Sequence, residues 1–217
     1  VQTYFWRQTH DPLKLASYYF GFFVFLPIGF ALNGKLLAYF SSVRLYWVGC
    51  IFQGIVPFLI IFFQATSFTQ ILILGSIYGF ASGFFWANRN FLTLKATSKH
   101  DRTYYSSLES FIGTMASIVV PFLTGWLLIL GEKTGLYLTD GAYRGMSFLG
   151  LIFIFLSGFV LQKIASPKER LQHLFLKPQS QRWQQLRLLD TCHGFYNGIE
   201  YIIPVIVLLM LAGNEAT

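Results

Sequence analysis

The chain has 217 residues, of which 54% are hydrophobic and only 12% are charged, and its formal net charge is +7. Soluble globular domains carry about 25% charged residues, so this composition excludes an ordinary soluble domain. The basic residues lie in short segments between long apolar runs, which indicates determinants of membrane topology and not a nucleic-acid-binding surface.

Six apolar runs are long enough to cross a bilayer, because a spanning helix needs about 20 predominantly apolar residues. Four runs contain no charge, one has Lys35 near its end, and the last contains a single acid, Glu200. The predicted spans are residues 17–40, 45–63, 70–88, 110–131, 145–162 and 191–213. We therefore expect an all-α fold, a polytopic transmembrane helix bundle with about six spans in the lipid bilayer.

The N-terminal segment and the small residues of the third and fourth spans carry local signals. A short loop over Tyr4–Leu15, turned by Asp11-Pro12, is predicted before the first span.

Small residues recur every four positions in the third and fourth spans, which predicts close packing of these helices on each other or on partners. These residues are Gly75, Gly79 and Gly83, followed by Gly113, Ser117, Pro121 and Gly125.

The basic residues are distributed unevenly between the predicted loops. Twelve of the sixteen follow the first, third and fifth spans, and six of those twelve lie in the long polar segment 163–190. An excess of Lys and Arg marks the cytoplasmic side of a membrane protein. We therefore expect these three loops to be cytoplasmic, with residues 163–190 forming a linker between the first five spans and the sixth.

Three stretches carry motif-like residues. The loop after the first span reads Gly34-Lys-Leu-Leu-Ala-Tyr-Phe-Ser-Ser-Val-Arg44, the third span ends in Phe84-Phe-Trp-Ala-Asn-Arg-Asn90, and the fourth span holds Pro121 after Val120. With the layout of five spans, linker and one span, they resemble the major facilitator superfamily, whose members join two six-helix halves by a long cytoplasmic loop. The first stretch keeps the Gly and a basic residue of the family's Gly-x-x-x-Asp-Arg-x-Gly-Arg-type loop but lacks its Asp. Val120 stands where family antiporters often have the Gly of a Gly-Pro pair.

On this resemblance, the six spans correspond to the second to seventh helices of the family. Residues 1–162 would form an incomplete N-terminal bundle, 163–190 the linker between the halves, and 191–217 the first span of the C-terminal bundle. The apolar start Val1–Phe5, which lacks an initiator Met, is expected of a piece of a longer chain. The remaining helices of that chain are therefore expected as partners.

The resemblance implies a secondary transporter that moves a small solute by alternating access, with protons as the candidate coupling ion. It also implies a multi-pass protein of the cell (plasma or inner) membrane. The alternative is a membrane-embedded enzyme of the acyl- or glycosyltransferase type. Such an enzyme would need acid, base or metal-binding groups that lie at the same depth in the membrane. Glu200 is the only ionisable group deep in a predicted span, and its nearest partner, His193, is about two turns away. We therefore expect a transporter and not an enzyme. No His, Cys and Asp cluster has metal-ligand spacing, so neither a metal nor another cofactor is expected.

Arg89 and Glu109 are the candidate gate pair. Arg89 ends the third predicted span and Glu109 opens the fourth, so both side chains would lie about one turn inside the same membrane face. We hypothesise an ion pair that stabilises one conformation of the cytoplasmic gate. The alternative interpretation of Glu109 is a capping box with Ser106, in which both side chains satisfy free backbone N–H groups at a helix start.

Polar residues within the spans are candidates for coupling or for solute contact. At about 1.5 Å per residue along the last predicted span, Glu200 lies about 13 Å deep, near the middle of the bilayer. An acid there needs a partner or a wet cavity. Tyr196 and Asn197 share its helical face, while Asn33 and Gln53 are polar groups within the first and second spans. Two interpretations stay open for these residues: a group that faces a transport cavity, or a side chain hydrogen-bonded across helices for packing.

Overall fold

The computed structural model describes five long α-helices in succession. The described residues are 4, 5, 8, 11–135, 139–162, 181, 184, 185, 188, 189, 192–194, 196 and 207. The helices are α2 (Pro12–Leu36), α3 (Ser42–Phe62), α4 (Phe68–Ala96), α5 (Asp101–Thr134) and α6 (Thr139–Gln162). Each is long and apolar enough to cross a membrane, and the described part of the chain contains no strand. The predicted all-α transmembrane bundle is therefore confirmed.

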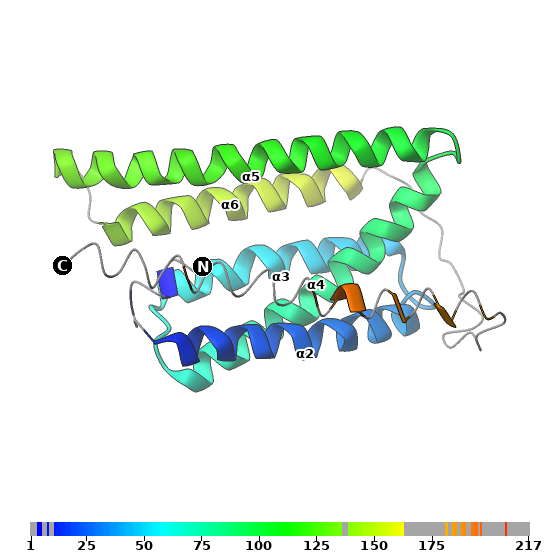
Figure 1. Ribbon diagram of the computed structural model, residues 1–217, viewed down its shortest axis with the longest axis horizontal. Helices are drawn as coiled ribbons and strands as arrows, with labels where there is room; N and C mark the ends of the chain where they lie inside the picture. Colours follow the sequence, from blue (N-terminus) through cyan, green and yellow to red (C-terminus); the bar gives the residue numbers. More distant parts are fainter. Residues whose placement is uncertain are drawn as a thin grey trace.

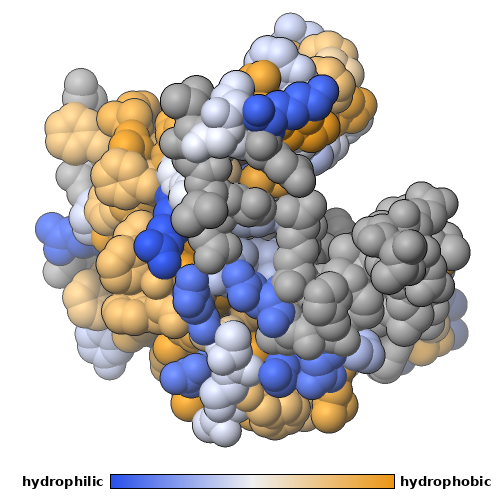
Figure 2. Space-filling model, turned by 90° about the vertical axis from the view of Figure 1, so that its left-hand side faces the viewer, coloured by the Kyte–Doolittle hydropathy of each residue, from blue (hydrophilic) through white to orange (hydrophobic). Residues whose placement is uncertain are grey.

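The helices alternate in direction, so their termini gather at two ends of the bundle (Figure 1). We call the end where α2 begins the Pro12 end and the end where α2 finishes the Leu36 end. α4 crosses the bundle obliquely and packs against both α2 and α3, while α6 packs against α3 and α5. Figure 2 shows the Pro12 end, where hydrophilic side chains gather across the end face and hydrophobic side chains dominate one flank. This distribution fits a bundle whose sides face lipid.

α2 begins at Pro12, so the predicted loop over Tyr4–Leu15 is wrong from Pro12 onward. The Asp11 carboxylate accepts a hydrogen bond from the backbone N–H of Leu13 at 2.9 Å, which caps the helix. Pro12 takes the first helical position, where its missing N–H costs no intrahelical bond. The Asp-Pro pair therefore starts a helix and does not turn a loop.

α4 and α5 extend well beyond the apolar runs from which they were predicted. α4 continues to Ala96 and α5 begins at Asp101, whereas the predicted spans stop at residue 88 and resume at residue 110. α2, by contrast, ends at Leu36, four residues before the end of its predicted span. An apolar run measures the part of a helix that crosses hydrocarbon. Polar turns continue the helical hydrogen bonding beyond it, which is why hydropathy underestimates the length of these helices.

The contact between α2 and α4 is built on glycines. A Cβ atom at Gly79 would collide with the carbonyl oxygen of Phe22, and one at Gly83 would lie 2.7 Å from the backbone nitrogen of Phe30. Only glycine allows two helix backbones to approach this closely. The close packing predicted for the glycines of the third span is therefore present, with α2 as the partner. In α5, a Cβ atom at Gly113 would meet no described atom within 4 Å.

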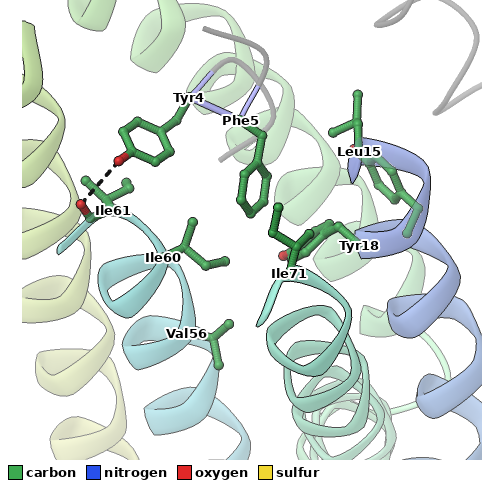
Figure 3. Close-up of a cluster of buried hydrophobic side chains, with 9 residues drawn as sticks. Tyr4, Phe5, Leu15, Tyr18, Val56, Ile60, Ile61 and Ile71 are labelled. Carbon is green, nitrogen blue, oxygen red and sulfur yellow. Dashed lines mark hydrogen bonds between the residues drawn. The ribbon is translucent and has the colours of Figure 1, made fainter. Parts of the chain in front are cut away.

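A hydrophobic cluster joins α2, α3 and α4 at the Pro12 end. Figure 3 shows side chains from the three helices converging there, together with two aromatic residues that precede α2. The Tyr4 hydroxyl donates a hydrogen bond to the carbonyl oxygen of Ile61 at 3.4 Å. The cluster consists of Tyr4, Phe5, Leu15, Tyr18, Tyr19, Val56, Ile60, Ile61 and Ile71. Its interdigitated rings and branched side chains fix the three helices relative to one another at this end.

Candidate functional site

A charged contact between two membrane-crossing helices joins Arg89 of α4 to Glu109 of α5. The guanidinium and the carboxylate form an ion pair, and the two side chains are 27% and 34% exposed. The guanidinium also lies 4.5 Å from the centroid of the Trp86 ring, close enough for a cation–π interaction. Arg89 is seven residues before the end of α4 and Glu109 eight residues after the start of α5. Both therefore lie roughly 10–12 Å from the ends of their helices at the Leu36 end.

The start of α5 excludes a capping role for Glu109. The helix begins at Asp101, so Ser106 and Glu109 stand in its interior and the capping-box interpretation is wrong. The first turn has its own local bonds, since the backbone N–H of Asp101 donates to the Ser98 hydroxyl at 3.3 Å. The Glu109 carboxylate is therefore free to reach a neighbouring helix. Its contact with Arg89 is a feature of the structure, whereas the action of that pair as a gate stays a prediction.

A buried amide pair links α2 and α4 one position away from the ion pair. The side-chain nitrogen of Asn88 donates to Oδ1 of Asn33 at 2.6 Å and also to the carbonyl oxygen of Phe84 at 2.8 Å. Asn33 is 2% exposed and Asn88 is 0% exposed. The Asn88 Oδ1 atom is buried without a hydrogen-bond partner among the described residues. In this conformation the two amides interlock the helices and do not face an open cavity.

A second polar pair links α3 and α4. The amide nitrogen of Gln53 donates to the Ser82 hydroxyl at 3.0 Å. Ser82 is 2% exposed, whereas Gln53 is half-buried. Sequence reasoning identified Gln53 but missed Ser82, which stands between Gly79 and Gly83. The available signal was the run of small residues, because a serine within such a run can hydrogen-bond to a polar side chain of the facing helix.

The remaining candidate residues are described only in part. Glu200 and Asn197 lie outside the described residues. Tyr196 is 59% exposed, and its ring stacks on His193 with centroids 6.3 Å apart. Of the candidate residues, the structure thus brings together Arg89 and Glu109. Among the described residues, no group of three His, Cys, Asp or Glu side chains is placed to hold a metal ion.

Comparison with known proteins decides the family. A model of the Major Facilitator Superfamily matches residues 3–213, nearly the whole chain. The chain belongs to the major facilitator superfamily. The resemblance inferred from layout and motifs is therefore confirmed, and the five described helices form part of a major-facilitator bundle in a multi-pass membrane protein.

Two bacterial proteins are similar in sequence to this chain. "Uncharacterized protein YqgE" of Bacillus subtilis (strain 168) is 22% identical over 212 residues, which cover 96% of this chain and 49% of the relative. "Uncharacterized protein in sodM 3'region" of Geobacillus stearothermophilus is 25% identical over 130 residues, which cover 59% of this chain and 60% of the relative. The chain thus spans about half the length of the first of these relatives and 60% of the second. No solved structure matches it significantly.

Proposed function

We propose that this chain forms most of the first helix bundle of a secondary transporter, which moves a small solute across the plasma or inner membrane by alternating access. Residues 163–190 would link this bundle to a second one that begins with residues 191–217. Family membership favours transport over an acyl- or glycosyltransferase activity, so the proposal includes no catalytic step. The observation that carries it is the family match over residues 3–213. The Arg89–Glu109 ion pair, which connects two helices that are not packed side by side along their length, is the proposed gate.

The orientation of the proposed transporter follows from its basic residues. Lys35, Arg44, Lys95, Lys99 and Arg102 all lie at or beyond the Leu36 end of the described helices. Because Lys and Arg are enriched in cytoplasmic loops, we assign the Leu36 end to the cytoplasm and the Pro12 end to the outside. The ion pair then lies on the cytoplasmic side of the bilayer.

An ion pair with this exposure suits a gate. Solvent-exposed pairs contribute about 0.2–1 kcal/mol and are screened by salt, and the two side chains of this pair are about one-third exposed. A transporter must pass between conformations that differ by only a few kcal/mol. A contact between α4 and α5 of this strength would bias one conformation without locking it. A fully buried pair would be much harder to open, because breaking it leaves an unpaired charge in a low dielectric.

Solute and coupling roles are proposed for the polar residues within the spans. Gln53 is a better candidate for solute contact than Asn33, because Gln53 is half-buried while Asn33 is enclosed between α2 and α4. Glu200, with Tyr196 and Asn197 on its helical face, is proposed to bind the coupling ion or proton. An acid near the bilayer midplane is costly unless it faces a partner or a wet cavity, and such residues commonly mark ion pathways.

Transport by the full-length protein in proteoliposomes tests this function. A panel of sugars, amino acids, organic acids, organic cations and drugs is offered with and without an inward proton gradient. We expect at least one solute to accumulate above the level in protein-free liposomes, and the gradient to increase that accumulation. Equilibration without accumulation would support transport but exclude proton coupling. Turnover of an acyl or glycosyl donor in the same vesicles, without movement of any solute, would replace the proposal by the enzyme alternative.

A further inference from the structure

An apolar groove lies between α2, α3 and α4 on the outside of the bundle. Its volume is about 560 Å³, within the range of small-molecule sites. The groove is lined mainly by Phe25 of α2, Val48 and Phe52 of α3, and Ile73, Ile77 and Phe80 of α4. Phe52 and Ile73 are 45% and 52% exposed, so the groove is open along its side. The glycine contacts that hold α2 against α4 do not close it.

The groove offers no polar group to a water-soluble ligand. Ser76 is the only residue of its lining with a polar side chain. Its hydroxyl already donates to the carbonyl oxygen of Leu72 at 2.8 Å. A polar solute would lose its hydration there without gaining hydrogen bonds, which is unfavourable. The lining therefore selects a hydrocarbon chain.

The groove crosses the middle of the bundle. Its lining on α4 extends from Leu72 to Phe84, a rise of about 18 Å, and these residues lie beside the middle of α2, between Gly21 and Gly29. Half of the hydrocarbon core of a bilayer is about 15 Å thick. An acyl chain that enters the groove beside Val48, at its Leu36 end, would therefore reach the midplane about halfway along the groove.

A cation stands at the Leu36 end of this groove. Arg44 is one turn before Val48 and two turns before Phe52 on α3, and residues four apart share a helical face. The Arg44 side chain is exposed, and no carboxylate pairs with it among the described residues. Lys35 in the last turn of α2 is exposed at the same end. A phosphate bound there would meet complementary charge where the acyl chain enters the groove.

We propose that this groove binds one phospholipid of the cytoplasmic leaflet, with an acyl chain against Phe52 and Ile77 and an anionic head group on Arg44. The site is distinct from the Arg89–Glu109 pair, and it does not depend on which solute is transported. The cytoplasmic leaflet is the anionic one, which adds to the attraction of a basic side chain at this level. The bound lipid would be an integral part of the α2–α3–α4 packing.

Native mass spectrometry of the full-length protein in mild detergent tests the proposal. The probes are phosphatidylglycerol and phosphatidylcholine with identical acyl chains. We expect one tightly retained lipid per protein, with a preference for phosphatidylglycerol. Arg44→Gln should reduce that preference roughly fivefold, as expected for one basic side chain near an anionic surface. Lys133→Gln, an exposed cation at the opposite end, is the matched control and should leave it unchanged.

A substitution that fills the groove tests the acyl-chain contact separately from the head-group contact. Ile77→Trp should lower retention of both lipids, whereas Val119→Trp on the 47% exposed face of α5 should not. Retention by Ile77→Trp equal to that of the unmodified protein would overturn the acyl-chain site. An Arg44→Gln protein with unchanged preference would overturn the head-group site, and it remains informative if the tryptophan variant fails to fold. A stable dimer in place of bound lipid would show that a second copy covers the groove and would reject the proposal.

Discussion

The side chain of Asn88 donates a 2.6 Å hydrogen bond to Asn33 across the α2–α4 contact, at a point where neither residue is more than 2% exposed. The pair lies on the two helices that approach most closely through their glycines. Polar interactions between membrane helices contribute about 0.6 kcal/mol on average and up to about 1.7. This bond therefore adds direction and register to a contact whose closeness comes from backbone packing.

The first prediction concerns this amide pair. Replacing Asn88 by Leu removes the donor and leaves the buried Oδ1 of Asn33 unsatisfied, which costs about 1–3 kcal/mol. We expect a clear loss of thermal stability in detergent, and a coupling of roughly 0.6–1.7 kcal/mol in the double-mutant cycle with Asn33→Leu. Asn90→Leu, an exposed asparagine of the same helix, is the control and should change little. Strict additivity of the two substitutions would show that the bond contributes nothing.

The second prediction concerns the glycine contact. Gly79→Ala places a methyl group against the backbone of Phe22, which cannot move away without separating α2 from α4. Overpacking of this kind costs about 1–3 kcal/mol. The unfolding midpoint of the purified protein should fall accordingly.

Gly54→Ala provides the matched control for that variant. A Cβ atom at Gly54 would lie 3.4 Å from the Ile154 side chain, and a side chain can adjust where a backbone cannot. We expect this variant to be tolerated. If Gly54→Ala and Gly79→Ala have equal effects, backbone proximity is not what makes glycine necessary in α4.

The sequence predicted those features of the fold that depend on a single segment of the chain. Apolar runs located all five described helices, and the spacing of Gly75, Gly79 and Gly83 indicated a close helix contact. The partner of that contact was not readable, because a stripe of small residues does not specify which helix it faces. For the same reason the Asn33–Asn88 bond was missed, although both amides were recognisable as polar groups within spans.

The candidate site was predictable to a different extent. Arg89 and Glu109 belong to consecutive helices joined by a short loop, so their proximity followed from the loop and the helical rise. The capping interpretation of Glu109 failed because the helix starts at a polar turn that hydropathy does not detect. Asp11 and Pro12 were misinterpreted for a related reason, since the same residues favour turns and helix starts.

The third prediction tests the ion pair by charge reversal. Arg89→Glu or Glu109→Arg alone places two like charges together, so each should impair transport by the full-length protein or its stability. The double reversal should recover part of the loss, because it restores opposite charges at the two positions. Both the transport rate of a solute found in the proteoliposome panel and the unfolding midpoint are measured. Lys133→Glu serves as an exposed control on α5. A double mutant no better than the worse single mutant would contradict pairing in the functional protein.

The fourth prediction concerns orientation in the membrane. Phe63 and Tyr39 are both 70% exposed and lie at opposite ends of the bundle. In a background with Cys50 and Cys192 replaced by Ser, Phe63→Cys should react with a membrane-impermeant maleimide on intact cells. Tyr39→Cys should react only after permeabilisation. The reverse pattern would place the Leu36 end outside and reject the assignment from basic residues.

The last prediction concerns Glu200, for which the last predicted span gives an expected depth of about 13 Å in the bilayer. If its carboxylate carries the coupling proton or cation, Glu200→Gln keeps the shape of the side chain while removing the charge that binds the ion. We expect normal abundance in the membrane, loss of gradient-driven accumulation, and retained exchange of solute between the two sides. Exchange needs only the conformational change, whereas accumulation needs the coupled ion. Glu215→Gln, an acid beyond the predicted span, should behave like the unmodified protein. Undiminished accumulation by Glu200→Gln over a range of external pH would remove Glu200 from the mechanism. Loss of both accumulation and exchange would assign Glu200 a structural role between helices.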